Sequence, residues 1–437
     1  MTNAHADARP AANNANIRKA VTAATVGTVI EWYDYALYGA ASGLIINKLF
    51  FPNLSPTTGV LAAFATFAVG YFARPVGGVV ISHIGDKFGR KPALILTIAL
   101  MGLATVLMGL LPTYQTIGIM APVLLVVLRL IQGFGAGAEL AGAIVLVAEY
   151  APANKRAFYT GLPNAATLVG IMLATMSFLG ISYLPEDVLL GWAWRVPFLL
   201  SGALFLVALY IRKHLDETPE YVAAMAKAEA NKHEQKVPIG QLLRESPREV
   251  FFGFLSVTGH NANAYILSTF SLSYMVNNVG MTRTDGLIAV SIGTLCGIAG
   301  VPFLGALADR IGPSKVYIGG CLFILVMAFP LFVMLDTGNL LWAAIGLGIC
   351  YAGGFGATAG AQGAFLSNLF PTRYRFSGLA MSRELNGVLV AGPTPLIAAA
   401  LVAAGNGRPT YVAIYLMACC SLAILAILMV KHRSVHA

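Results

Sequence analysis

The stretch Gly85-Asp86-Lys87-Phe88-Gly89-Arg90-Lys91 is a charged segment between two long apolar runs, and a second version of it follows later in the chain. That version is Gly305-Ala306-Leu307-Ala308-Asp309-Arg310-Ile311-Gly312. A second pattern, Glu149-x-x-Pro152-x-x-x-Arg156, returns as Asn368-x-x-Pro371-x-x-x-Arg375 at almost the same distance along the chain. Two halves therefore share one plan. Duplication in an apolar chain indicates a secondary transporter, whose halves move about a site near the middle of the membrane.

The composition excludes an ordinary water-soluble globule. Hydrophobic residues make up 57% of the chain and charged residues only 11%, and the mean hydropathy is +0.74, whereas soluble domains carry roughly 25% charged residues. Residues 1–16 lack the apolar core of a removable signal peptide, so we expect the N-terminus to be retained. All five cysteines lie in apolar runs without metal-like spacing, and we interpret them as packing residues. We expect no metal site and no cofactor.

Twelve apolar runs are long enough to cross a hydrocarbon layer of about 30 Å. We expect helices at 20–48, 58–82, 92–112, 115–148, 157–183, 190–211, 250–279, 286–308, 315–335, 339–369, 376–404 and 409–431. If the N-terminus is inside, most of the 28 Lys and Arg residues fall on that side. The positive-inside rule therefore predicts that both termini are cytoplasmic. The net charge of +9 then reflects topology and gives no reason to expect nucleic-acid binding.

This pattern predicts an all-α integral membrane protein with twelve transmembrane helices in two pseudo-symmetric six-helix bundles. The expected parts are an N-terminal tail at 1–19, bundles at 20–211 and 250–431, a cytoplasmic linker at 212–249 and a short tail at 432–437. The linker is charged and has too few apolar residues to bury a core, which favours a solvated spacer over a binding domain. We expect no C-terminal domain, and we expect the protein to act as a monomer in the lipid bilayer.

The repeated loop also carries a family resemblance. Its pattern, Gly-x-x-x-Asp-(Arg/Lys)-x-Gly-x-x-(Arg/Lys), resembles that of the major facilitator superfamily, and the resemblance covers the whole chain. Ser82 stands where the first glycine is usual, and Pro313 replaces a usual basic residue in the second copy. Acids and guanidinium groups at helix ends can clamp helices together, although a solvated loop is the alternative. The expected cytoplasmic gate consists of Asp86, Arg90, Glu149, Arg156, Asp309, Arg310 and Arg375.

Further fragments narrow this resemblance. They are Glu31-Trp32-Tyr33-Asp34-Tyr35-Ala36-Leu37-Tyr38-Gly39, Arg74-Pro75-Val76-Gly77-Gly78, Arg129-Leu130-Ile131-Gln132-Gly133 followed by Glu139, Glu149-Tyr150-Ala151-Pro152 and Leu369-Phe370-Pro371-Thr372-Arg373-Tyr374-Arg375. Together they resemble the metabolite:proton symporter family, which includes shikimate, α-ketoglutarate, citrate and proline/betaine permeases. Its osmosensing members carry a long C-terminal extension, whereas this chain stops at Ala437, which disfavours an osmolyte. The resemblance implies a multi-pass protein of the bacterial inner membrane.

The first apolar run contains Glu31, Asp34, Tyr35 and Tyr38 on one helical face. A charge at the bilayer centre costs about 2.5–3.5 kcal/mol, so ionisable groups there indicate function. The alternative is that one carboxylate is a structural partner of an intramembrane arginine. A carboxyl that alternates between a dry environment and contact with an arginine changes its protonation, and this change would couple a proton gradient to transport.

We therefore expect Asp34, Glu31, Arg129 and Glu139 to take part in proton coupling, with Asp34 as the proton carrier. Glu139 lies roughly 15 Å along its helix from Arg129, and a helix-packing role is equally open. The expected substrate-binding residues are Tyr35, Tyr38, Arg74, Gln132, His260, Asn263 and Arg383. A structural role is the alternative for His260. Arg383 and Glu384 are adjacent and point about 100° apart, so we do not expect them to pair with each other.

Three intramembrane arginines favour an anionic ligand, because a guanidinium grips a carboxylate with two parallel hydrogen bonds. The alternative is that they only neutralise the intramembrane acids Glu31, Asp34, Glu139 and Glu384. Ala174-Thr175 stands where drug exporters of the superfamily usually have Gly-Pro, which favours uptake. We expect a proton-coupled symporter that imports a small organic acid. A symporter of a zwitterionic osmolyte and a proton-driven exporter of a drug or metabolite are the alternatives. We do not expect an enzyme, since no set of catalytic residues falls at one membrane face.

Overall fold

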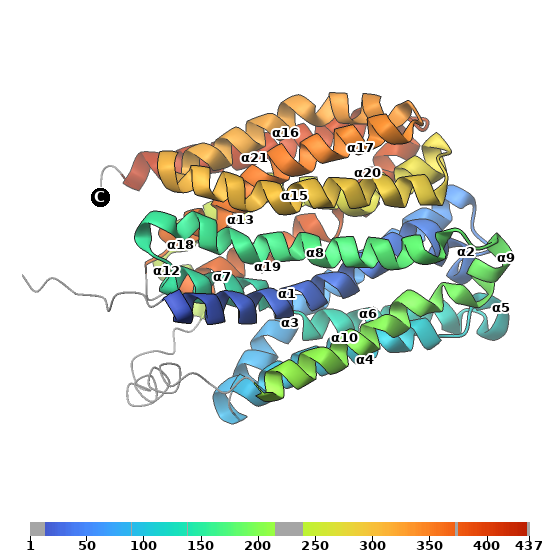
Figure 1. Ribbon diagram of the computed structural model, residues 1–437, viewed down its shortest axis with the longest axis horizontal. Helices are drawn as coiled ribbons and strands as arrows, with labels where there is room; N and C mark the ends of the chain where they lie inside the picture. The colour runs from blue at the N-terminus through green and yellow to red at the C-terminus, as the bar shows by residue number, and fades with distance from the viewer. Residues whose placement is uncertain (1–13, 89, 138, 215–238, 372–374, 435–437) are drawn as a thin grey trace, which may run out of the picture.

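The computed structural model describes residues 14–88, 90–137, 139–214, 239–371 and 375–434, and in these residues the regular structure is entirely helical (Figure 1). The helices run side by side along the long axis of the molecule. The start of α1 and the end of α21 lie at the same end of the bundle (Figure 1). A chain that crosses a membrane an even number of times has both of its ends on the same side.

Helices occupy every one of the twelve predicted spans. In the first half they are α1 (Asn14–Ala41) with η1 (Ser42–Ile46) and α2 (Asn47–Phe50), α3 (Pro56–Phe88), α4 (Arg90–Leu110), α5 (Tyr114–Ile117), α6 (Met120–Gly135), α7 (Glu139–Tyr150), η2 (Ala153–Lys155), α8 (Arg156–Ser182), α9 (Glu186–Val188) with η3 (Leu189–Ala193), and α10 (Arg195–His214). In the second half they are α12 (Ile239–Glu245), α13 (Pro247–Tyr265) with η4 (Ile266–Phe270), α14 (Ser271–Tyr274) and η5 (Met275–Val279), α15 (Arg283–Ile311), α16 (Pro313–Asp336), α17 (Leu340–Ile349) with η6 (Cys350–Phe355) and α18 (Gly356–Leu369), α19 (Arg375–Asn386) with η8 (Gly387–Ala391) and α20 (Thr394–Ala404), and α21 (Thr410–Ser434).

Seven helical stretches of the described residues are long and apolar enough to cross a membrane unaided. A pair bent by 41°, Glu186–Ala193 with Arg195–Val207, would make an eighth. Other predicted spans have shorter apolar runs, such as Ile95–Leu110 and Met120–Gly135. The helix α1 carries two acids in its interior, which lower its hydropathy. The spans with fewer apolar residues therefore depend on their neighbours to cover their polar groups.

The span predicted at 115–148 is broken, because α6 ends at Gly135 and α7 begins at Glu139. The backbone of α3 passes very close to this break. A Cβ atom at Gly137 would lie 2.4 Å from the backbone oxygen of Arg74. The small residues near the break let α3 approach it. The predicted linker is also partly helical, since α10 reaches His214 and α12 lies near its end.

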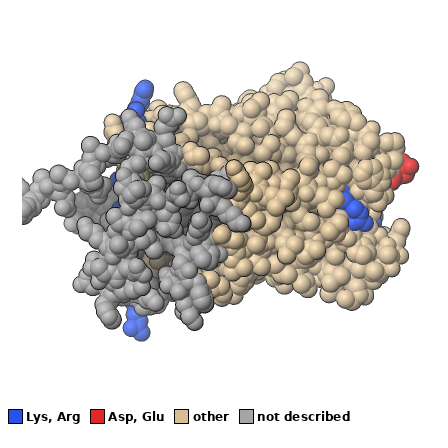
Figure 2. Space-filling view, turned by 60° about the horizontal axis from the view of Figure 1, so that its bottom comes forward, with Lys and Arg blue, Asp and Glu red and all other residues tan. Residues whose placement is uncertain are grey.

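The surface between the two ends is apolar. On the face in Figure 2, a wide band without charged residues separates the charged groups at the two ends. Large hydrophobic side chains are openly exposed along the helices, including Phe303 at 73% and Val326 at 68%. In water such a surface would aggregate, whereas acyl chains accommodate it. The fold is that of a multi-pass membrane protein, as the sequence predicts.

The helices α3 and α6 approach each other through glycine. A Cβ atom at Gly133 would lie 1.8 Å from the backbone oxygen of Gly70, and one at Gly77 would lie 1.9 Å from that of Phe134. In lipid, helices gain association energy chiefly by such close packing. These two glycines hold α3 beside α6, and so position Arg74 and Arg129 relative to each other.

Gly133→Ala should destabilise the protein by about 1–3 kcal/mol, since the added methyl group meets backbone atoms that cannot move aside. The measurement is the thermal unfolding midpoint of the purified protein in detergent. Gly319→Ala in α16 is the matched control, because a Cβ atom at Gly319 meets nothing within 4 Å. Equal midpoints for the two variants would contradict the packing argument.

Candidate functional site

Arg129 on α6 is the most enclosed cation of the candidate site, with 0% of its surface exposed. Its Nη1 donates to Oε1 of Gln132, and its Nη2 donates to the backbone oxygen of Phe67 at 2.7 Å. The ring of Tyr38 lies 4.1 Å from its Cζ. A Cβ atom at Gly70 would lie only 2.9 Å from Nη2, so this glycine makes room for the guanidinium. Among the described residues no carboxylate forms an ion pair with Arg129.

Asp34 on α1 is also fully buried. Its Oδ1 accepts a hydrogen bond from Oγ of Ser201 on α10 at 2.5 Å, and its Oδ2 has no hydrogen-bond partner among the described residues. Gln132 donates through Nε2 to Oγ1 of Thr105 at 2.8 Å, and Thr105 donates its own proton to the backbone oxygen of Met101 at 3.0 Å. Arg129 and Asp34 are therefore electrostatic neighbours without direct contact.

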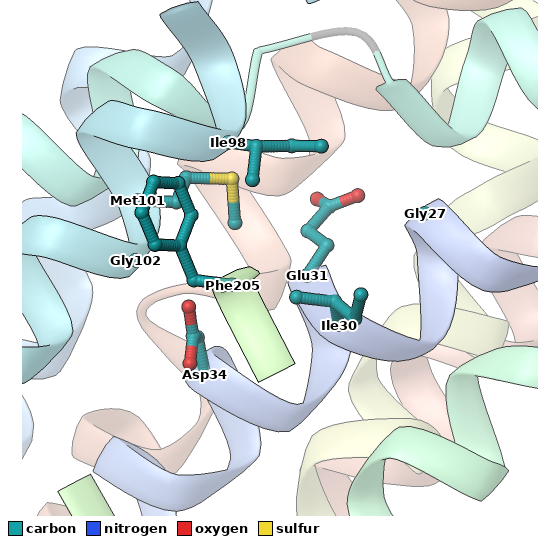
Figure 3. Close-up of a pocket in the computed structure, with 8 residues that line it drawn as sticks. All are labelled: Gly27, Ile30, Glu31, Asp34, Ile98, Met101, Gly102 and Phe205. Atoms are coloured by element: carbon teal, nitrogen blue, oxygen red, sulfur yellow. The ribbon is translucent and has the colours of Figure 1, made fainter. Parts of the chain in front are cut away.

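A small cavity of about 10 Å³ opens beside the two acids of α1. Its lining residues are Gly27, Ile30, Glu31, Asp34, Ile98, Met101, Gly102 and Phe205. Figure 3 shows Glu31 and Asp34 one turn apart on α1, with the side chains of Met101 and Phe205 nearby. A cavity of this size has room for about one water molecule. The two carboxyl groups thus border one narrow space that is otherwise apolar.

Arg74 on α3 forms ion pairs with acids from both halves of the chain. Its Nη2 lies 3.1 Å from Oε1 of Glu31 on α1, and its Nε lies 3.1 Å from Oε2 of Glu384 on α19. The rings of Tyr35 and Tyr71 lie 5.1 and 5.4 Å from its Cζ. One of the two acids of α1 is therefore the ion-pair partner of an intramembrane arginine, which is the structural alternative that the sequence left open for Glu31.

Aromatic side chains surround Arg74 and also join the halves. The hydroxyl groups of Tyr71 on α3 and Tyr265 on α13 are hydrogen-bonded to each other. The ring of Trp32 stacks on Tyr265 at a centroid distance of 6.1 Å, and Tyr35 meets Tyr71 edge-on at 5.3 Å. The hydroxyl of Tyr35 and Nε1 of Trp32 are buried and have no hydrogen-bond partner in the described residues.

The second half holds its own polar groups. His260 shares a hydrogen bond of 2.8 Å between its Nδ1 and Oγ1 of Thr358. Arg383 donates through Nη1 to Oε1 of Gln362, and no ion pair between Arg383 and Glu384 is present in the described part of the chain. Nδ2 of Asn263 is buried without a partner among the described residues. These residues lie on α13, α18 and α19, and Arg383 is an electrostatic neighbour of both Glu384 and Arg74.

One end of the interface between the halves is closed by Asp309. Its Oδ1 accepts from the backbone N–H of Ala157 at 2.7 Å, and its Oδ2 accepts from that of Phe158 at 2.9 Å. Both residues lie in the first turn of α8, where an acid also interacts favourably with the helix dipole. Arg156 donates through Nη1 to Oδ1 of Asn368 at 3.3 Å. The contacts of Asp309 and Arg156 cross between the halves.

Of the remaining gate candidates, Arg310 and Arg375 have described side chains, and both lie in the second half. Arg375 donates through Nε to the backbone oxygen of Ser367 within its own half at 2.8 Å, and Arg310 follows Asp309 at the end of α15. Four predicted site residues have side chains outside the described part of the structure: Asp86, Arg90, Glu139 and Glu149.

Contacts between the halves also close the opposite end. Oγ of Ser182 lies 2.9 Å from Oγ1 of Thr284. Asn277 donates through Nδ2 to the backbone oxygen of Gly43 at 2.8 Å. The described halves are therefore in contact at both ends of the interface, with the Arg74 ion pairs between them.

Several residues of this site were not among the sequence candidates. Thr105 and Ser201 were missed because hydroxyl residues are common in membrane helices, and only the fold brings these two to Asp34. Tyr71 gave a weak signal, since it precedes Arg74 by one helical turn and so shares its face. Glu384 was recognised as an intramembrane acid, but its pairing across the halves depends on the tertiary structure.

The chain is similar in sequence and in fold to known membrane transporters. The chain matches the model of the Major Facilitator Superfamily over residues 24–383. The shikimate transporter of Escherichia coli K12 is 38% identical over 95% of this chain and 94% of its own. A proline/betaine transporter of the same strain is 34% identical over 93% and 81%. The crystal structure of a D-xylose-proton symporter superposes with a TM-score of 0.72 at 19% identity, covering 94% of this chain and 96% of its own.

An inner membrane metabolite transport protein of Escherichia coli K12 is 36% identical over 96% of this chain and 94% of its own. The likeness to the xylose transporter shows the fold, and the relatives of higher identity show the family. The resemblance drawn from the sequence fragments is confirmed. The chain belongs to the major facilitator superfamily, and it is a multi-pass membrane transporter rather than an enzyme.

Proposed function

We propose that this protein is a proton-coupled symporter that imports a small organic acid across the bacterial inner membrane, with both termini in the cytoplasm. The observation that carries the proposal is the buried pair of Arg129 and Asp34. The cation has no direct carboxylate partner in the described structure, and the acid has one oxygen without a hydrogen-bond partner there. The relatives named for shikimate, inner membrane metabolite and xylose-proton transport support the substrate class, the location and the coupling.

Coupling follows from the charge balance of this pair. When Asp34 is ionised, its negative charge compensates its electrostatic neighbour Arg129. Arg129 and Arg74 flank the same ring, that of Tyr35, so protonation of Asp34 raises the net positive charge of this buried cluster, and a carboxylate bound there then restores the balance. Proton and anion therefore favour each other's binding, which is the condition for symport.

The narrow cavity beside Glu31 and Asp34 provides a route for the proton. It has room for about one water molecule. One water between the two carboxyl groups can pass a proton from one to the other. Asp34 is the proton carrier in this scheme, because Glu31 is already neutralised by its ion pair with Arg74.

A zwitterionic osmolyte is the second candidate substrate. The rings of Trp32, Tyr35, Tyr71 and Tyr265 form a cluster of the kind that binds quaternary ammonium groups. A proline/betaine transporter is also among the relatives. The guanidinium of Arg74, however, already lies over two of these rings, those of Tyr35 and Tyr71. A cation therefore already occupies the place that an ammonium group of the ligand would take, which favours an anionic ligand.

Uptake into proteoliposomes tests the proposal directly. Acidifying the outside by one pH unit should increase the steady-state accumulation of an organic acid up to about tenfold, because one proton moves with each substrate and each unit contributes about 1.4 kcal/mol. The panel comprises shikimate, α-ketoglutarate, citrate, proline and glycine betaine, each with and without an inward pH gradient. Uptake that ignores pH and follows a sodium gradient would overturn the proton coupling.

Asp34→Asn keeps the shape of the side chain but cannot carry a proton. Accumulation driven by a pH gradient should therefore fall to the level of empty liposomes, while exchange of labelled for unlabelled substrate at equal concentrations continues. Asp285→Asn, at the start of α15 and outside the site, is the control and should accumulate substrate normally. If Asp34→Asn still accumulates substrate with an unchanged pH dependence, Glu31 becomes the next candidate.

Alternating access requires that the contacts of Asp309 break when that end of the interface opens. Asp309→Asn removes the charge at the start of α8, an interaction worth typically about 0.3–1 and up to about 2 kcal/mol, so the open population should rise about two- to thirtyfold. Ser367→Cys is a suitable reporter because Ser367 lies near this end and is only 1% exposed. The reporter is placed in a protein whose native cysteines have been replaced. Adding Asp309→Asn should then increase the alkylation rate of the thiol at position 367 by the same factor as the open population.

Asp336→Asn, whose carboxylate accepts from Tyr274 on another part of the second half, is the control. It should leave the alkylation rate unchanged. The same rate for Asp309→Asn and the control would show that Asp309 does not hold this end closed.

A further inference from the structure

The contact of Glu384 with Arg74 has the geometry of a bound carboxylate ligand. Oε2 of Glu384 lies 3.1 Å from Nε of Arg74, and Oε1 lies 3.5 Å from Nη2. Two oxygens facing two nitrogens of one guanidinium edge are the arrangement in which arginine recognises carboxylates. Glu384 comes from α19 in the second half, whereas Arg74 lies on α3 in the first.

The two acids on Arg74 are not equivalent. The Glu31 side chain is 1% exposed and belongs to the same half as Arg74, whereas the Glu384 side chain is 15% exposed. Glu384 is also an electrostatic neighbour of Arg383, which donates to Gln362 in the described structure. Glu384 can therefore leave Arg74 and remain in the favourable electrostatic field of Arg383, while Glu31 remains in place.

Two buried polar groups beside Arg74 lack partners in the described residues. They are the hydroxyl of Tyr35, whose ring lies 5.1 Å from Cζ of Arg74, and Nε1 of Trp32, which stacks on Tyr265. The large majority of buried hydrogen-bond donors in proteins have an acceptor. A ligand on Arg74 that carries hydroxyl or carbonyl oxygens would satisfy both, and the surrounding rings would pack against its body.

We propose that Glu384 is a tethered competitor of the substrate. In the closed, empty protein its carboxylate occupies the position on Arg74 that the carboxylate of a hydroxylated or carbonyl-bearing monocarboxylate takes on binding. The substrate then displaces Glu384 and so breaks the ion pair that holds the two halves together at this level. The inference rests on the proposed function, since it requires an organic acid as substrate.

The affinity for carboxylates should therefore increase when the competitor is removed. Glu384→Gln should lower the dissociation constant for shikimate about tenfold or more. Binding is measured by isothermal titration and by ligand-induced thermal stabilisation of the purified protein in detergent, with no pH gradient. Benzoate and quinate serve as further carboxylate probes, and the methyl ester of shikimate serves as the uncharged probe. The gain should appear for the carboxylates and not for the ester.

Three further variants make the test specific. Arg74→Gln combined with Glu384→Gln should lose the gain, because the cation itself is gone. Glu384→Asp keeps the charge and shortens the side chain by one methylene, so it should raise carboxylate affinity in the same direction by a smaller factor. Glu249→Gln, in the first turn of α13, removes a charge from the same half outside the site and should leave affinity unchanged.

The inference is overturned if Glu384→Gln and Glu384→Asp bind every carboxylate probe no more tightly than the wild-type protein does. It is also overturned if the gain is as large for the methyl ester as for shikimate. Failure of proton coupling would appear in the proteoliposome experiment and leave these equilibrium constants unaffected. The two proposals can therefore fail separately.

Discussion

A charged side chain in the middle of a membrane protein must find its partners inside the protein, because hydrocarbon cannot solvate it. The helices around the centre of this molecule are arranged to meet that requirement. Arg129 is held by a side-chain amide, a backbone oxygen and an aromatic ring, and Arg74 is held by two carboxylates. Gly70 and Gly133 permit the close approach of α3 and α6 that makes these contacts possible.

The same requirement ties the central charges to the contact between the halves. Arg74 takes one carboxylate from its own half and one from the other, so separating the halves at this level would leave buried charges with fewer partners. Removing one partner of a buried ion pair is strongly unfavourable, about 3–5 kcal/mol. The halves can separate there only if another group replaces the lost partner. In the proposed mechanism a substrate carboxylate replaces Glu384. Until the substrate binds, the ion pair between Arg74 and Glu384 stabilises the contact between the halves.

Asp34 and Arg129 differ from this arrangement in a way that suits a proton site. They lie in one half and interact through their charges without direct contact, so their interaction does not depend on the contact between the halves. Protonation of Asp34 would change the charge that Arg129 presents. In the proposed transport cycle, the Arg74 ion pairs respond to the substrate and the pair of Asp34 and Arg129 responds to the proton, and the ring of Tyr35 lies beside both arginines.

The sequence by itself determined the helical class, the twelve spans, the duplication and the family, because these depend on local hydropathy and on motifs that each occupy one short segment. It also identified Glu31, Asp34, Arg74 and Arg129 as functional candidates, since an ionisable residue in an apolar run is conspicuous. Only the tertiary structure decided the partners. Glu31 and Glu384 are far apart in the chain, and their meeting on Arg74 depends on how α1, α3 and α19 pack. The roles of Thr105 and Ser201 depend equally on packing, because a hydroxyl residue acquires its function only from the groups that the fold brings to it.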